Sequence, residues 1–239
     1  MSYAALTRED RNPVKRWLQA RRLAAAVALV EPGRAARIVD YGGGDGEVSA
    51  RLAARFPDAE IVCFEPAPHL RAEAEARLAG FPRTRVVADE ADLPAGWAQT
   101  ALCLEVLEHL PPPETTRALE VLERVLAPGG ALVCGAPVEI GPMALAKGLF
   151  RRRRRPDDFD GAWPNILAAA RGRPPRERPM QPIAEGRAYH PHHLGFDHRA
   201  LVGALAQRFR VTRRTGSPFG RLLPLANAEL YIVALKEDR

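Results

Sequence analysis

The sequence predicts a doubly wound, Rossmann-like α/β fold built on a mostly parallel seven-stranded sheet. Over the first two thirds of the chain, apolar runs of strand length alternate with helical patterns, as expected for a parallel sheet covered on both faces. A glycine-rich turn joins the first of these runs to the helix after it. Two strand-like runs near the end of the chain predict an antiparallel edge hairpin.

Local patterns place each expected element. Residues 12–30 carry apolar side chains near a 3.6-residue period and predict an opening helix. The parallel strands are expected at residues 36–41, 59–65, 83–89, 100–105 and 130–137. The helices that join them are expected at residues 47–56, 72–79 and 114–126. Residues 197–209 predict a further helix with Asp197 as its N-cap, and the edge hairpin is expected at residues 210–216 and 228–237.

The regular pattern stops after the fifth strand. Residues 138–195 show no strand signal, only a short apolar helix pattern at 142–150, five arginines at 151–155 and a tract rich in proline and arginine at 171–182. A gap of this length inside a compact domain is too long for a plain connection. We therefore expect a lid or a substrate-binding insertion.

Composition and charge set the outer limits. With 239 residues, 46% of them hydrophobic, the chain is long enough for one domain with a full core. Because no apolar run has the length of a membrane span and residues 1–10 lack the apolar stretch of a signal peptide, a cytoplasmic protein is expected. Cys63, Cys103 and Cys134 lie in separate apolar runs and are expected to be buried core residues. The net charge of +6 suits an anionic partner, although arginine-rich composition also arises without one.

Acidic side chains follow the ends of the expected strands. Asp40 opens the motif VDYGGGDGE, whose spacing differs from that of dinucleotide sites and suits a ligand with an ammonium group. Glu65 ends the second strand nineteen residues beyond Gly46, about where an acid in this fold meets ribose hydroxyls. Asp89 and the backbone of Glu90 end the third strand, in position to bracket an adenine ring.

Taken in order, these motifs resemble those of the class I S-adenosylmethionine-dependent methyltransferases. The resemblance covers residues 37–137 and extends more loosely to the C-terminus. Its motifs are VDYGGGDG, EP after the second strand, ADEADLP, EVLEHL and VLAPGGALVCGAP. The resemblance implies S-adenosylmethionine as the cofactor. It also implies that Asp40 orders the loop and reaches the amino group of the methionyl part, while Gly42, Gly44 and Gly46 pass beneath it.

The resemblance implies roles for four further acidic residues. It gives Glu65 the ribose and Asp89 the adenine amine. It gives Glu105 a backbone position beside the methionyl part and the sulfonium. Glu90 is expected to contact the cofactor through its backbone. It stands where the family often has alanine, so its side chain is expected to point outward.

The chain is expected to be a single methyltransferase domain. Its insertion is expected to decide the class of acceptor. The expected parts are an N-terminal helical cap at 1–35, a cofactor-binding core at 36–137, a substrate or lid insertion at 138–195, and a C-terminal helix and strand pair at 196–239.

Two histidines are the predicted catalytic residues. A sulfonium methyl is already activated, so the protein must hold the acceptor in line with it and help remove the proton of a hydroxyl acceptor. His109 follows the fourth strand on the ligand-binding side of the sheet, where Glu108 would orient its ring. His192 precedes Phe196 by four residues, a spacing that the family's small-molecule group often shows. An ordered structural histidine is the alternative interpretation of His109.

The motif EVLEHL also resembles part of the metal-binding motif of small-RNA 3′-terminal 2′-O-methyltransferases. In that interpretation Glu105, Glu108, His109 and His192 would form a set of oxygen and nitrogen ligands. Leu110 stands where a second histidine would follow His109, and the same motif occurs in ubiquinone-type and sugar methyltransferases. The sequence-based prediction therefore assigns no metal.

The predicted function is methyl transfer, to oxygen, on a small or lipid-linked acceptor such as a sugar, a glycolipid or a secondary metabolite. A metal-assisted RNA 2′-O-methyltransferase and a non-catalytic cofactor-binding interaction module are the alternatives. The apolar helix and the arginines at 151–155 suit peripheral contact with an anionic membrane surface, or a solvated lid neutralised by Asp157, Asp158 and Asp160. Nucleic acid is disfavoured because the arginines lack interleaved aromatic rings. The acceptor's identity and the oligomeric state are left open.

Overall fold

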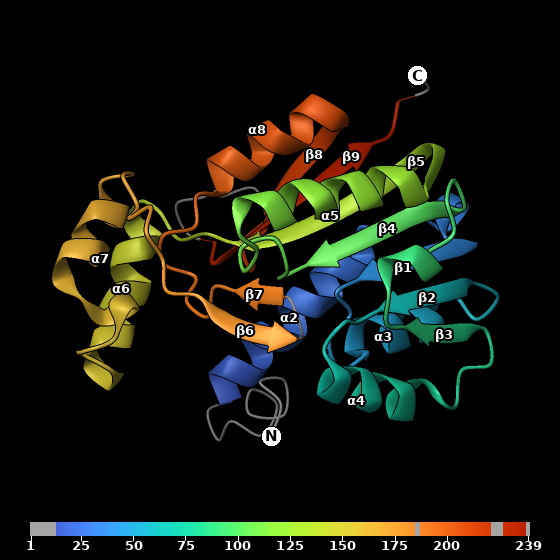
Figure 1. The fold of residues 1–239 in the computed structure, drawn as a ribbon, viewed down its shortest axis with the longest axis horizontal. Coiled ribbons are helices and arrows are strands. Elements are labelled where there is room, and N and C mark those ends of the chain that lie inside the picture. Colours follow the sequence, from blue (N-terminus) through green and yellow to red (C-terminus); the bar gives the residue numbers. More distant parts are fainter. Residues whose placement is uncertain (1–12, 185–186, 221–226, 238–239) are drawn as a thin grey trace.

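The computed structural model describes residues 13–184, 187–220 and 227–237, arranged around one central sheet (Figure 1). Its strands are β1 Arg37–Tyr41, β2 Glu60–Phe64, β3 Thr84–Val87, β4 Ala98–Leu104, β5 Leu126–Pro137, β8 Arg210–Ser217 and β9 Glu229–Leu235. They lie in the order β3-β2-β1-β4-β5-β9-β8. The first five pair in parallel, whereas β9 is antiparallel to both β5 and β8. The predicted mostly parallel seven-stranded sheet with an antiparallel edge pair is confirmed.

Helices cover both faces of this sheet because its strands are apolar on both sides. They are α2 Pro13–Ala28, α3 Glu47–Arg55, α4 Pro68–Leu78, α5 Pro112–Val125 and α8 His198–Arg208. On β1, Val39 packs in a cluster with α5 and α8, while its neighbour Ile38 packs with α2 and α3 on the opposite face. The helix expected at 197–209 begins as predicted, since the Asp197 side chain accepts a hydrogen bond from the Arg199 backbone N–H.

The three cysteines are core residues, as predicted. Cys63, Cys103 and Cys134 are buried and free, and Cys103 lies opposite Cys134 in the pairing of β4 with β5. Burial raises the pKa of all three thiols, so they stay protonated and unreactive at neutral pH.

The insertion contains more regular structure than its sequence predicts. It forms α6 Pro142–Arg154, the short 3₁₀ turn η3 Phe159–Gly161, α7 Trp163–Ala170, and a two-stranded ribbon of β6 Gln181–Ala184 with β7 Arg187–Tyr189. Figure 1 shows α6 and α7 beyond one end of the sheet, with the ribbon between them and the strands. The absence of strands expected for 138–195 is wrong, because so short a ribbon depends on cross-strand pairing and carries no long apolar run.

The helix at the start of the insertion is longer than expected. α6 continues through the arginine run to Arg154, so these arginines form helical turns of a packed hairpin. Ala144 of α6 packs against Ile166 and Ala169 of α7 and against Leu194. Within the described ranges, no helix combines the length and the apolar character needed to cross a membrane.

Candidate active site

A cavity of about 710 Å³ lies at the carboxyl ends of β1, β2 and β4. Open α/β sheets bind ligands at this edge, because the loops that follow parallel strands converge there. α2, the end of α6, η3, the β6–β7 ribbon and the segment after the ribbon complete the wall. Its polar lining side chains include Arg22, Asp40, Tyr41, Asp45, Glu65, Glu90, Glu105, His109, Tyr189 and His193.

The glycines of the loop after β1 serve two different purposes. A Cβ on Gly42 would lie 2.5 Å from Val106, one on Gly43 would lie 2.4 Å from the Cys63 sulfur, and one on Gly46 would lie 3.0 Å from the Ala74 backbone. These three positions are therefore bare because the protein itself packs against them.

Gly44 differs from the other glycines of the loop. It lines the cavity, as Gly42 and Gly43 also do, but it alone of the four would have open space around a Cβ, and its φ is 57°. Gly46, predicted to touch the cofactor, is the N-cap of α3 and does not line the cavity. Within this loop, the backbone that a ligand would approach is centred on Gly44.

Asp40 is held in a buried position below the loop. Its side chain is 2% exposed, and the Ser49 hydroxyl donates a 2.7 Å hydrogen bond to Oδ2. Burial raises the pKa of this carboxyl to about 6, because the charged form loses its hydration. A positively charged ligand group in the cavity would replace the lost hydration, as the sequence-based role of Asp40 requires.

Glu65 joins the end of β2 to the glycine loop. Its Oε2 accepts a 2.9 Å hydrogen bond from the Gly44 N–H, and its Oε1 accepts a 2.8 Å bond from the Ala67 N–H. Burial raises the pKa of this carboxyl. Each carboxylate oxygen can accept a further bond, so Glu65 retains acceptor capacity toward the cavity.

The structure reverses the expected positions of Asp89 and Glu90. Asp89 is exposed, caps the 3₁₀ turn η2 Glu90–Asp92 by accepting from the Ala91 N–H, and does not line the cavity. Glu90 is buried and lines the cavity, so the expectation that it points outward is wrong. The Tyr41 hydroxyl donates to it at 2.6 Å and Arg117 of α5 at 2.7 Å, and these partners make its burial tolerable.

Glu105 turns the chain sharply after β4. It has a φ of 56°, which is rare for a residue with a side chain. Its carboxylate forms a 2.9 Å ion pair with Arg22 of α2, and Arg22 also lies 3.3 Å from Glu229 of β9. Sequence reasoning missed Arg22, because a lone arginine between apolar helix positions gives no sign of buried partners.

His109 lies in the cavity with a defined tautomer. Its Nδ1 is 2.7 Å from the His190 carbonyl oxygen, which only accepts hydrogen bonds, so Nδ1 carries the proton and Nε2 is unprotonated in the neutral ring. Burial lowers the pKa of this imidazole and favours the neutral form. The His190 carbonyl orients the ring, and the expected orienting role of Glu108 is wrong, because that carboxylate lies 3.8 Å from Nε2.

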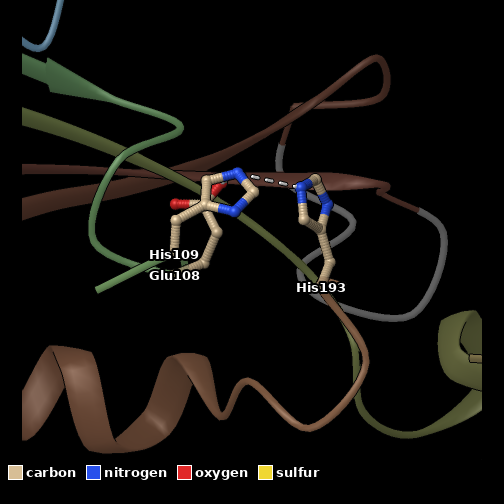
Figure 2. A group of neighbouring side chains, drawn as sticks. All are labelled: Glu108, His109 and His193. Atoms are coloured by element: carbon tan, nitrogen blue, oxygen red, sulfur yellow. Dashed lines mark hydrogen bonds and ion pairs between the residues drawn. The ribbon is translucent and has the colours of Figure 1, made fainter. Parts of the chain in front are cut away.

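His192 does not line the cavity. Its Nδ1 lies 3.6 Å from Asp160, and its ring stands 5.9 Å from Phe159 of the insertion. Its neighbour His193 lines the cavity instead, with its Nε2 3.2 Å from Nε2 of His109 (Figure 2). Adjacent loop residues point to opposite sides, and the sequence alone does not distinguish them.

Comparison with known proteins identifies a methyltransferase domain in this chain. Residues 38–130 match the family model of a methyltransferase domain. That segment contains most of the motifs on which the resemblance to the class I methyltransferases rests. The predicted resemblance is confirmed.

A trans-aconitate 2-methyltransferase of Methylobacterium nodulans is similar to this chain. It is 38% identical over 116 residues, which are 48% of this chain and 42% of that protein. The match therefore spans less than half of the relative's length.

Solved structures share the fold of the methyltransferase domain. The Burkholderia thailandensis 1,6-didemethyltoxoflavin-N1-methyltransferase, solved with 1,6-didemethyltoxoflavin and S-adenosylhomocysteine, aligns with a TM-score of 0.58 and 18% identity over 99% of this chain and 86% of that one. The N-methyltransferase NodS of Bradyrhizobium japonicum, in complex with S-adenosylhomocysteine, aligns with a TM-score of 0.58 and 16% identity over 97% and 91% of the two chains.

The methyltransferase domain should lose cofactor affinity when Gly44 is replaced. Gly44→Val places a branched side chain in the open space of the cavity, and we expect S-adenosylmethionine affinity to fall by about tenfold or more in calorimetry.

Gly96→Val is the matched control. Gly96 also has a positive φ, of 62°, and open space around a Cβ, but it lies in an exposed loop before β4. Both variants should lose about 1–2 kcal/mol of stability from the left-handed backbone. Unchanged affinity in Gly44→Val would show that this loop does not hold the cofactor.

Proposed function

We propose that this protein transfers the methyl group of S-adenosylmethionine to an oxygen atom of a small or lipid-linked acceptor, such as a sugar, a glycolipid or a secondary metabolite. The proposal rests mainly on the composition of one cavity. The glycine loop, Asp40 and Glu65 line one part of its wall, and His109, whose Nε2 is unprotonated, lines another. The similar proteins described above, which are methyltransferases of trans-aconitate and of a toxoflavin precursor, support a small-molecule acceptor.

The residues of the wall suit the groups of this cofactor. Asp40 offers a carboxylate to an ammonium group, Glu65 offers acceptor oxygens to hydroxyl groups, and Gly44 offers close approach to the backbone. When bound, the cofactor supplies a methyl group on a positively charged sulfur, and its transfer leaves a neutral thioether. The chain's own part is to orient both reactants and to remove the acceptor's proton.

His109 is the residue proposed to activate the acceptor. A hydroxyl acceptor must lose its proton as it gains the methyl group, and a positioned group that assists this loss adds about a hundred- to ten-thousandfold in rate. Nε2 of His109 is unprotonated, and the residue lines the cavity. His192, the other predicted catalytic residue, lies outside the lining and is not favoured by its contacts.

We also propose that the hairpin of α6 and α7 contacts an anionic phospholipid surface. Leu149, Phe150 and Trp163 are 48%, 54% and 40% exposed, which is unusual for large apolar side chains. The guanidinium of Arg154 lies 5.0 Å from the Phe150 ring centre, and that of Arg152 lies 5.2 Å from Trp163. Apolar side chains next to cations suit the boundary between acyl chains and acidic headgroups.

Three of the five arginines have polar partners within the insertion. Arg152 donates to the Gly161 carbonyl at 3.2 Å, and Arg155 lies 3.1 Å from Asp158. Arg151 forms ion pairs with Glu139 at 2.7 Å and with Asp160 at 3.4 Å. Glu139 is fully buried, so removing Arg151 would leave Lys147, 3.0 Å away, as the one remaining cation paired with this charge among the described residues. The surface function therefore falls to the exposed Arg153 and Arg154.

The pH dependence of cofactor affinity tests Asp40. Because burial raises its pKa to about 6 in the free protein, the carboxylate that attracts the ammonium group is present above pH 6 and is lost as the pH falls through 6. Calorimetry should show affinity about tenfold lower at pH 5 than at pH 7. Asp40→Asn should bind weakly at both pH values; an equal pH dependence in this variant would assign the titration to another group.

Turnover separates the two histidines. His109→Ala should lower kcat by about a hundredfold or more while cofactor affinity stays within about threefold, because the ring acts on the acceptor and not on the cofactor. His192→Ala is the control from the neighbouring loop and should keep wild-type turnover. Full activity in His109→Ala, measured once an acceptor is identified by screening, would remove this residue from the mechanism.

Vesicle co-sedimentation tests the hairpin surface. Arg153→Gln combined with Arg154→Gln should weaken binding to phosphatidylglycerol vesicles at low salt, since each basic residue near such a surface contributes about 1 kcal/mol. Wild-type binding should itself fade at high salt because the attraction is screened. The matched control, Arg213→Gln with Arg214→Gln, removes two exposed arginines from β8 and should bind like wild type. Absence of salt-sensitive binding by wild type would leave the hairpin as a solvated lid.

A further inference from the structure

Three donor side chains meet beside the cavity. Glu108, His109 and His193 each offer one atom, and these atoms all lie within 4.8 Å of one another. Figure 2 shows the two imidazole rings facing each other through nitrogen atoms, with the Glu108 carboxylate beside His109. The Nε2 atoms of the two histidines are 3.2 Å apart, and Oε1 of Glu108 is 3.8 Å from Nε2 of His109.

Glu108 is the least explained side chain of this group. It is fully buried, and among the described residues neither of its carboxylate oxygens has a hydrogen-bond partner. Burial raises the pKa of the Glu108 carboxyl to about 8 in the free protein. Buried carboxyl groups normally have hydrogen-bond partners, because burying one without a partner destabilises the fold by roughly several kcal/mol through lost hydration. A cation at this position would supply the missing partner.

The surroundings hold both histidine segments in place. The His190 carbonyl fixes the proton of His109 on Nδ1, which leaves Nε2 with a lone pair directed at the group. Metal-binding histidines typically have their second nitrogen fixed in this way. Arg178 donates hydrogen bonds to the backbone carbonyls of Glu108 and His192 and so joins the two segments that carry the three donors.

We propose that Glu108, His109 and His193 bind one divalent transition-metal ion, which activates the acceptor oxygen. Two donors that each stand about 2.1 Å from one ion are about 3.0–3.8 Å apart for angles of about 90–130°. The separations of His109 from His193 and from Glu108 fall in this range, and Glu108 lies within 4.8 Å of His193. Two imidazoles and one carboxylate suit zinc, iron or cobalt better than magnesium or calcium. This proposal differs from the sequence-based prediction, which assigns no metal, and from the alternative ligand set that included Glu105 and His192.

This inference rests on the proposed function and specifies how His109 acts. As a ligand, His109 no longer accepts the proton itself; the ion lowers the pKa of a hydroxyl bound to it. That hydroxyl releases its proton to water, its oxygen forms the bond to the methyl carbon, and the carbon–sulfur bond breaks with its electron pair staying on sulfur. Because His109 and His193 line the cavity, an acceptor bound there would reach an ion held by these residues.

Cobalt binding tests the site without any acceptor. The full chain, freed of metal with a chelator, should bind one Co²⁺ per molecule and gain visible d–d absorption, and Zn²⁺ should displace it. Glu108→Gln, which preserves shape, and His193→Ala should each lower Co²⁺ affinity by at least about 10- to 100-fold, the range that outer-sphere changes already reach. His192→Ala, in the same loop but outside the group, should bind Co²⁺ like wild type.

Two results would overturn the inference. One is no Co²⁺ or Zn²⁺ binding by wild type at tens of micromolar metal. The other is equal binding by wild type, Glu108→Gln and His193→Ala, which would place the ion elsewhere. S-adenosylmethionine affinity is measured in the same metal-free protein. If this cofactor binds but no metal does, the metal site is contradicted while the proposed methyl transfer is not.

Discussion

The burial of carboxylates at the carboxyl ends of parallel strands is the constraint on which the rest of this site depends. The topology brings Asp40, Glu65, Glu90, Glu105 and Glu108 to one edge of the sheet, where water is largely excluded. The partners of these carboxylates differ. Asp40 accepts from a hydroxyl, Glu65 accepts from backbone N–H groups, and Glu90 and Glu105 each pair with an arginine. The Glu108 carboxylate has no hydrogen-bond partner among the described residues. Because their partners differ, carboxyl groups with different pKa values lie close together at this edge of the sheet.

The sequence was informative wherever a residue's position along a strand determines its position in space. Asp40 and Glu65 end buried strands, and the cavity lies where these strands converge, so their placement followed from the alternation of elements. The glycine loop was found for the same reason, but the sequence did not separate Gly44, which faces the cavity, from Gly46, which packs against α4. That distinction depends on tertiary neighbours of the backbone.

Loops and side-chain direction were the parts that the sequence left undetermined. Glu90 turns inward because Tyr41 and Arg117, far apart in the chain, supply its partners. His193 and not His192 reaches the cavity, because the loop after β7 has no repeating period from which direction could be read. The short α7 and the β6–β7 ribbon depend on contacts within the insertion, which are long-range in sequence.

The insertion supplies one wall of a cavity whose opposite wall is built by the first half of the chain. Tyr189 and His193 come from this late segment, whereas the glycine loop, Asp40 and Glu65 come from the first two strands and their turns. The two walls are separate in the gene even though they face each other in space. Under the proposed function, substitutions in residues 138–195 would change the acceptor while leaving the residues proposed to hold the methyl donor unaltered, so this segment would be the natural unit for exchanging specificity between relatives.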